Sequence, residues 1–127
     1  MTDRATVVFG MRVVRVVADE DGQSRFEMAE VTFAEIHPGL SLSAFEGAAG
    51  VGFRRFAPGF ASTFHPTAMR ELAVVLSGEA EYEVSGGPTL RVGPGDVLQL
   101  DDTRGVGHRS RNLGEGERVM LVIALPG

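Results

Sequence analysis

The sequence predicts an all-β protein with the architecture of a double-sheet jelly-roll barrel. Turn-forming residues are frequent, with 17 Gly and 6 Pro among 127 residues. Short runs rich in Val, Leu and Phe lie between them, which is the pattern of short strands joined by turns. No window of ten or more residues has a helical apolar period that outweighs the strand pattern. About ten short strands with Gly/Pro turns are typical of a β-sandwich or barrel, and we expect the jelly roll.

Each expected strand is an apolar run bounded by turn residues. The first, residues 13–17, is Val-rich and ends at the acidic turn of residues 18–22. Residues 72–76 are continuously apolar, as expected of a buried strand, and the turn at 77–79 returns the chain beside them. The only helical structure expected is a turn at residues 67–72. The expected strands are residues 13–17, 24–36, 52–56, 62–65, 72–76, 80–84, 90–92, 97–100 and 117–125.

Length and composition define the broad class of protein. Residues 1–127 are the size of one domain. The absence of Cys excludes disulfides, thiol nucleophiles, iron–sulfur clusters and Cys-type zinc sites. All 12 basic residues are Arg, which excludes Schiff-base chemistry on a lysine. The net charge of −5 disfavours nucleic acid and anionic membranes as partners. No transmembrane segment is expected, and we predict a cytoplasmic protein.

Two of the three histidines lie in spaced polar motifs. In the first motif, five residues separate Gly59 from His65, and Thr67 follows two positions later. Glu71 comes after three more residues, and six residues then lead to Gly78. Residues two apart in a strand share one face, so we expect the side chains at 65, 67 and 71 to point into one barrel interior.

The second motif lies within residues 95–112. Five residues separate its first glycine from Asp101, and His108 stands four positions before Asn112. Together, residues 59–78 and 95–112 resemble the two motifs of the cupin superfamily, and the chain resembles a small single-domain cupin. A proline and a glycine of the second motif are replaced, and two extra residues precede its histidine.

The resemblance implies a divalent metal in the barrel, held in the family by three His and one Glu. Three of these positions are retained as His65, Glu71 and His108, while Thr67 stands in place of the second His. Two imidazoles and one carboxylate resemble the facial triad of non-haem iron sites, so we prefer Fe(II), with Mn, Ni, Cu or Zn as alternatives. The loss of the second His either opens a coordination position or marks a site with reduced metal affinity.

Further pocket residues are expected from strand alternation, and each also has a structural interpretation. An unpaired buried Glu71 would be costly, so it needs a cation or a hydrogen-bond partner. Most residues of the Phe-rich stretch 53–64 are expected in the core. Arg54 or Arg55 is a candidate to neutralise an anionic substrate, and at least one of the two is expected on the solvated surface. His37 is interpreted as structural. The additional candidates for the substrate pocket are Thr67, Phe53, Arg55, Tyr82 and Gln99.

These observations predict a metal-dependent enzyme that acts on a small organic molecule. His65, Glu71 and His108 are the candidate catalytic and metal-binding residues, and we favour oxygenation. The alternatives are isomerisation or cyclisation, decarboxylation or lyase chemistry on the same metal, or a non-catalytic small-molecule-binding protein. A homodimer is expected, because the apolar residues 7–9 and 13–17 exceed what one sheet face of a small barrel needs and because the resemblance implies frequent dimers.

Overall fold

The computed structural model describes residues 10–127, and within this range all regular structure is strand. No helix that could span a membrane occurs among these residues. The eleven strands are β1 (Met11–Ala18), β2 (Ser24–Val31), β3 (Ala34–His37), β4 (Leu40–Leu42), β5 (Gly50–Phe56), β6 (Glu71–Ser77), β7 (Glu79–Val84), β8 (Thr89–Val92), β9 (Val97–Leu100), β10 (His108–Leu113) and β11 (Arg118–Ala124).

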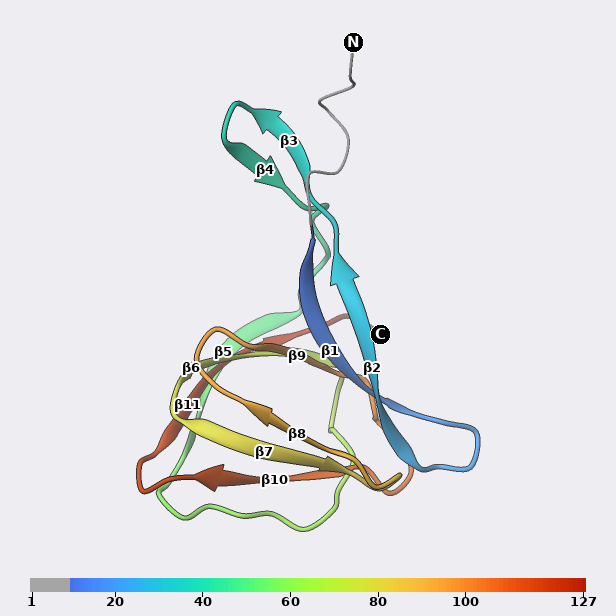
Figure 1. The fold of residues 1–127 in the computed structure, drawn as a ribbon. Helices are drawn as coiled ribbons and strands as arrows, with labels where there is room; N and C mark the ends of the chain where they lie inside the picture. The colour runs from blue at the N-terminus through green and yellow to red at the C-terminus, as the bar shows by residue number, and fades with distance from the viewer. Residues whose placement is uncertain (1–9) are drawn as a thin grey trace.

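The strands form a two-sheet barrel with a projecting hairpin (Figure 1). One sheet has six strands in the order β2-β1-β9-β6-β11-β5, and the other has three in the order β10-β7-β8. Figure 1 shows the two sheets facing each other across the barrel, while β3 and β4 form a separate hairpin beyond the ends of β1 and β2. The predicted all-β jelly roll is therefore confirmed.

The core fills the space between the two sheets. Strand alternation produces it, because every second residue is buried in β7, in β9 and in β6 as far as Val75. Val16, Val75 and Leu98 of the large sheet meet Val84 and Val92 of the small one in a single apolar cluster. This cluster packs next to the pocket, and Tyr82 and Leu100 belong to both.

Register brings the two histidine motifs together. His65 and His108 form an isolated antiparallel bridge, with His65 N donating to His108 O at 2.9 Å and His108 N donating to His65 O at 3.0 Å. Glu71, the first residue of β6, pairs with Leu100 and Ala124 of the flanking strands. The two motifs therefore meet at one end of the barrel.

The strand prediction for residues 24–36 needs correction, because this segment is two strands. β1 begins at Met11, which pairs with Val31, so β2 has no partner strand among the described residues beyond that point. The chain instead turns back through Gly39, whose φ of 81° suits a glycine, and β3 pairs with β4. The strand expected from residues 7–9 lies outside the described residues.

Two smaller expectations for residues 62–72 also differ from the structure. Residues 62–65 do not form a strand; they contact the edge of β10 opposite β7 through the His65–His108 bridge and a hydrogen bond from Ser62 N to Ser110 O at 2.9 Å. No helical turn forms at 67–72, because the backbone groups there bond to distant segments instead. Thr67 N donates to Asp102 O at 2.9 Å, and Leu125 N donates to Arg70 O at 2.9 Å.

Candidate functional site

A pocket of about 400 Å³ opens at the end of the barrel where the motifs meet. This volume suits a small organic molecule. The lining combines apolar side chains with several hydrogen-bonding and ionisable groups. The lining residues are Arg54, Phe56, Phe60, His65, Pro66, Thr67, Ala68, Met69, Glu71, Tyr82, Leu100, His108, Ser110, Val122 and Ala124.

A buried hydrogen-bond chain runs from Thr67 through Asp102 to His108. Thr67 Oγ1 donates to Asp102 Oδ1 at 2.9 Å, and Asp102 Oδ2 lies 2.7 Å from His108 Nδ1. All three residues are buried, and Asp102 is 0% exposed. A carboxylate removed from water needs such donors, so Thr67 and His108 together satisfy Asp102. The chain fixes the plane of the His108 ring.

His65 stands next to His108 at the pocket. The two ring centroids are 5.2 Å apart, in an edge-to-face arrangement. His65 is exposed and His108 is buried, so the pair extends from the pocket mouth inward. Gly107 packs directly against the His65 carbonyl with a φ of 81°, and a side chain at that position would collide with the His65 backbone. This close approach holds the two histidine segments together.

Glu71 is held by Arg54 rather than by a histidine. Arg54 NH1 donates to Glu71 Oε2 at 2.6 Å, and NH2 donates to Oε1 at 2.8 Å, which is a bidentate ion pair. The Glu71 side chain is 3% exposed, whereas that of Arg54 is 46% exposed. The hydrogen bonds to Glu71 hold the pKa of Arg54 above its ordinary value. Glu71 therefore has the cationic partner that its burial requires, supplied by Arg54 of β5.

The expected metal ligands do not form a metal site in this arrangement. Among residues 10–127, no group of three or more His, Cys, Asp or Glu side chains is placed to hold a metal ion. Both Glu71 oxygens are engaged by Arg54, and His108 Nδ1 is engaged by Asp102. The donor set His65, Glu71 and His108 thus lines one pocket but does not fit a metal as the side chains stand.

A second arginine lies behind the aromatic wall of the pocket. Arg118 is 0% exposed, and its Cζ lies 3.7 Å from the Phe56 ring centroid and 5.5 Å from that of Tyr82. Its NH2 donates to Ser110 Oγ at 3.1 Å, while Nε and NH1 have no partner among the described residues. Burial lowers the pKa of Arg118 and raises that of Tyr82. The Tyr82 hydroxyl therefore stays protonated beside the pocket.

The structure places the sequence-predicted residues in two groups. His65, Thr67, Glu71, Tyr82 and His108 all line the barrel pocket. Thr67, expected at water or substrate, uses its hydroxyl to donate to Asp102.

The assignments of Phe53, Arg55 and Gln99 to the pocket need correction, because these side chains lie outside it. Phe53 is 73% exposed, and Arg55 pairs with Glu117 at 2.8 Å. Gln99 Nε2 donates to Asp101. The alternation of β5 and β9 turns Arg54, Phe56, Leu98 and Leu100 inward instead.

Sequence reasoning did not single out three important residues. Arg54 was weighed only together with Arg55, although its two-residue spacing from Phe56 places both on one strand face. The contact of Asp102 with His108 depends on a loop whose path the spacing does not reveal. Arg118 did carry a signal, since it is a lone arginine at the start of an apolar strand.

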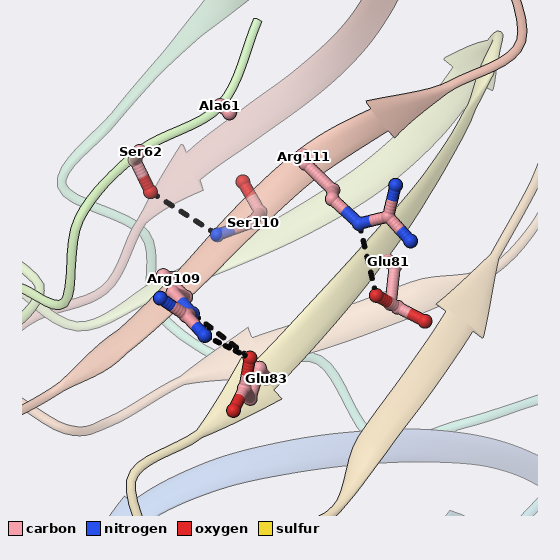
Figure 2. Close-up of a pocket in the computed structure, with 7 residues that line it drawn as sticks. All are labelled: Ala61, Ser62, Glu81, Glu83, Arg109, Ser110 and Arg111. Carbon is pink, nitrogen blue, oxygen red and sulfur yellow. Dashed lines mark hydrogen bonds and ion pairs between the residues drawn. The ribbon is translucent and has the colours of Figure 1, made fainter.

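A different pocket lies on the small sheet and contains no comparable chemistry. Figure 2 shows Arg109 directed at Glu83 and Arg111 directed at Glu81, across β10 and β7. Ser62 Oγ accepts a hydrogen bond from Ser110 N at 3.1 Å. The charges pair with each other on an exposed face, which is a common surface arrangement.

Comparisons with known proteins give one matching family model and several similar solved structures. The family model described as a cupin domain matches residues 52–124. A cupin 2 conserved barrel domain protein from Salinispora arenicola is 25% identical, with a TM-score of 0.49, covering 61% of this chain and 62% of that one. The Cnp3 cupin domain of Schizosaccharomyces pombe is 18% identical, with a TM-score of 0.50, covering 92% and 84%. A cupin domain from Bordetella pertussis is 19% identical over the full length of both chains, with a TM-score of 0.46. Curated proteins gave no significant match.

Proposed function

Because this chain belongs to the cupin family, we propose that its barrel pocket binds a small organic molecule and that His108 exchanges a proton with it. The observation that carries this proposal is the buried chain Thr67–Asp102–His108, which ends at the pocket. A histidine oriented through one ring nitrogen by a buried carboxylate is the usual arrangement of a general acid–base group.

The partner of His108 selects its tautomer. An ionised carboxylate accepts hydrogen bonds only, so Asp102 requires the proton of His108 on Nδ1. The other nitrogen, Nε2, then carries the lone pair, and no residue among 10–127 hydrogen-bonds to it. His108 thereby presents a base to a bound molecule.

Tyr82 supports the same chemistry from the neighbouring strand. Its ring centroid lies 5.8 Å from that of His108, and burial raises its pKa. Its hydroxyl donates to Met120 Sδ at 3.5 Å, a weak acceptor that an oxygen with developing negative charge would replace. His108 as base and Tyr82 as donor suit proton removal next to a carbonyl group.

The lining indicates the shape of the ligand. Phe56, Phe60 and Val122 form apolar wall, while His65 and His108 stand with the polar groups. We propose a substrate with an apolar body and a carbonyl or hydroxyl group at one end. Isomerisation, cyclisation and lyase reactions proceed by proton transfers of this kind, so the pocket favours them over the oxygenation expected from the sequence.

The metal-dependent alternative requires Glu71 to leave Arg54. A divalent ion on His65, Glu71 and His108 would act as a Lewis acid or bind oxygen. The ion pair of Glu71 with Arg54 argues for the proton-transfer function instead.

The test begins with the state of His108. Long-range ¹H–¹⁵N spectra should show His108 with its proton on Nδ1, and Asp102→Asn should change that signal. Enolisable 2-oxo acids and sugars are then incubated with the protein in D₂O, and exchange at carbon is followed by NMR. His108→Ala should lose the exchange, whereas His37→Ala, which alters an exposed histidine of β3, should keep it. Saturable binding with no exchange would identify a binding protein without this activity.

We also propose that the chain pairs with a second copy through the outer face of the six-stranded sheet. Val51 and Phe53 are 72% and 73% exposed there, and register places Leu121 and Ile123 beside them. Arg55, the charged neighbour on this face, is already paired with Glu117. Two copies placed face to face therefore meet without like-charge repulsion, as a self-complementary interface requires.

A further inference from the structure

We propose that the guanidinium of Arg54 is a built-in cation that occupies the place of a divalent metal in this pocket and prevents such a metal from binding. Arg54 takes both oxygens of Glu71, at 2.6 and 2.8 Å, in the geometry that matches a carboxylate most closely. Glu71 is 3% exposed, so little of its carboxylate is accessible to another ligand.

The histidines remain compatible with a metal, which makes Arg54 the decisive group. Histidines that bind metals usually hold a carboxylate with their second ring nitrogen, and His108 holds Asp102 with Nδ1. The only hydrogen bond of the His108 ring among the described residues is made by Nδ1, and the His65 ring centroid lies 5.2 Å from that of His108. Glu71 is the expected metal ligand that is not available, because Arg54 binds both of its carboxylate oxygens.

The charge of the pocket works in the same direction. Arg54 and Arg118 both lie near the Tyr82 hydroxyl, closely enough that each lowers its pKa against the larger effect of burial. Arg118 has no carboxylate partner among residues 10–127. A divalent ion that entered the pocket would lie beside the paired cation Arg54, with Arg118 behind the Phe56 and Tyr82 rings, and like charges repel strongly in a poorly solvated site. Removal of the Arg54 charge therefore both frees a ligand and reduces the repulsion.

The experiment compares metal binding by variants that differ at adjacent positions. Wild type, Arg54→Leu, Arg55→Leu and the double variant Arg54→Leu/Glu71→Gln are treated with chelator and then titrated calorimetrically with Zn²⁺. We expect Arg54→Leu to bind one equivalent at least tenfold more tightly than wild type. Arg55→Leu is the matched control, because Arg55 lies outside the pocket, and should behave as wild type. The double variant should lose the gain, since Glu71 supplies the added ligand.

Co²⁺ supplies an independent readout, because its visible absorption reports its ligands. Arg54→Leu should develop a Co²⁺ spectrum that wild type lacks. The inference is overturned if wild type binds Zn²⁺ as tightly as Arg54→Leu, or if folded Arg54→Leu shows no gain. Circular dichroism establishes folding, and Arg54→Gln, which retains an amide donor for Glu71, replaces the leucine variant if that one fails to fold. These readouts do not use proton exchange, so they stand or fall separately from the proposed function.

Discussion

The two faces of the six-stranded sheet each depart locally from the usual pattern, although the inner face also carries most of the apolar core. Its inner face carries the charged residues Arg54, Glu71 and Arg118, of which Glu71 and Arg118 are fully buried. Its outer face, on the same strands, carries Val51 and Phe53, which are largely exposed. In most barrels with one solvated face, polar residues point outward and apolar residues inward.

The inner face shows how buried charge is accommodated around a pocket. The Arg54–Glu71 ion pair and the Asp102–His108 pair each bring together two groups that would be costly alone. Arg118 is stabilised by the faces of Phe56 and Tyr82 and by one hydrogen bond. Such placements cost stability that an apolar core would not, so their concentration at one pocket indicates function.

The outer face carries a patch of neighbouring apolar side chains. Phe53, Leu121 and Val74 lie side by side across three strands, as do Val51, Ile123 and Leu72. An apolar patch that spans three strands is large for a surface in contact with water. The charged groups of the inner face are covered by residues of the same chain, whereas the outer face leaves Val51 and Phe53 exposed.

The largest difference in the free energy of unfolding is expected between Arg54→Ala, which changes the inner face, and Arg55→Ala, which changes the outer face. Loss of Arg54 leaves a buried carboxylate unpaired, and we expect the free energy of unfolding to fall by about 2–3 kcal/mol, less than for a fully buried pair because Arg54 is partly exposed. Loss of Arg55 breaks only a surface pair with Glu117 and should cost about 0.5 kcal/mol or less.

Urea denaturation of both variants measures this difference, and Zn²⁺ should restore part of the lost stability in Arg54→Ala alone. Equal losses at the two positions would show that the inner ion pair contributes no more than a surface one.

The fold could be predicted from the sequence because its signals are local. Apolar runs and Gly turns marked the strands β1, β6, β7 and β9 within a few residues. The β3–β4 hairpin could not be predicted, because it depends on where the partner of β2 begins rather than on residues 24–36 themselves.

The sequence predicted which residues line the candidate site better than it predicted which of their side chains contact each other. Motif spacing identified His65, Glu71 and His108, which do line one pocket. Spacing does not reveal that Arg54, 17 residues before Glu71, reaches its carboxylate, because that contact depends on the pairing of β5 with β11. Phe53 was assigned inward because strand alternation gives two equivalent phases until a neighbouring strand fixes one.

A moderate effect is expected from Asp101→Asn, which alters charges beside the pocket rather than within it. Burial would raise the pKa of Asp101, but hydrogen bonds from Arg15 and Arg70 outweigh it and hold the pKa below its ordinary value of 3.8. A depressed pKa means that the carboxylate stabilises the fold above pH 3.8 and loses this contribution as the pH falls through the folded-state pKa. We expect a cost of about 1 kcal/mol at pH 7.

Urea denaturation at a series of pH values checks this sign. The difference between wild type and Asp101→Asn should be constant at neutral pH and should shrink below pH 3.8. Asp21→Asn, an exposed substitution, is the control and should show no such dependence. A difference that grows in acid would contradict the assignment of Arg15 and Arg70 as the stabilising partners.

The smallest effect on stability, and the clearest on assembly, is expected from Phe53→Glu. The Phe53 side chain is 73% exposed in one chain, so a charge there should change the free energy of unfolding by about 0.5 kcal/mol or less at a concentration where the chain is monomeric. In a pair of copies the same charge would enter an apolar contact with Leu121 and Val74 and lose its water, which is costly without a partner.

Light scattering should therefore give wild type a mass of twice 13.5 kDa and Phe53→Glu a mass of 13.5 kDa at the same micromolar concentration. Thr89→Glu adds a charge to the exposed edge of the small sheet and should leave the mass at the wild-type value. The proposed interface would be wrong if wild type has a mass of 13.5 kDa or if Phe53→Glu keeps twice that mass. The exposed apolar residues of this face would then need a different explanation.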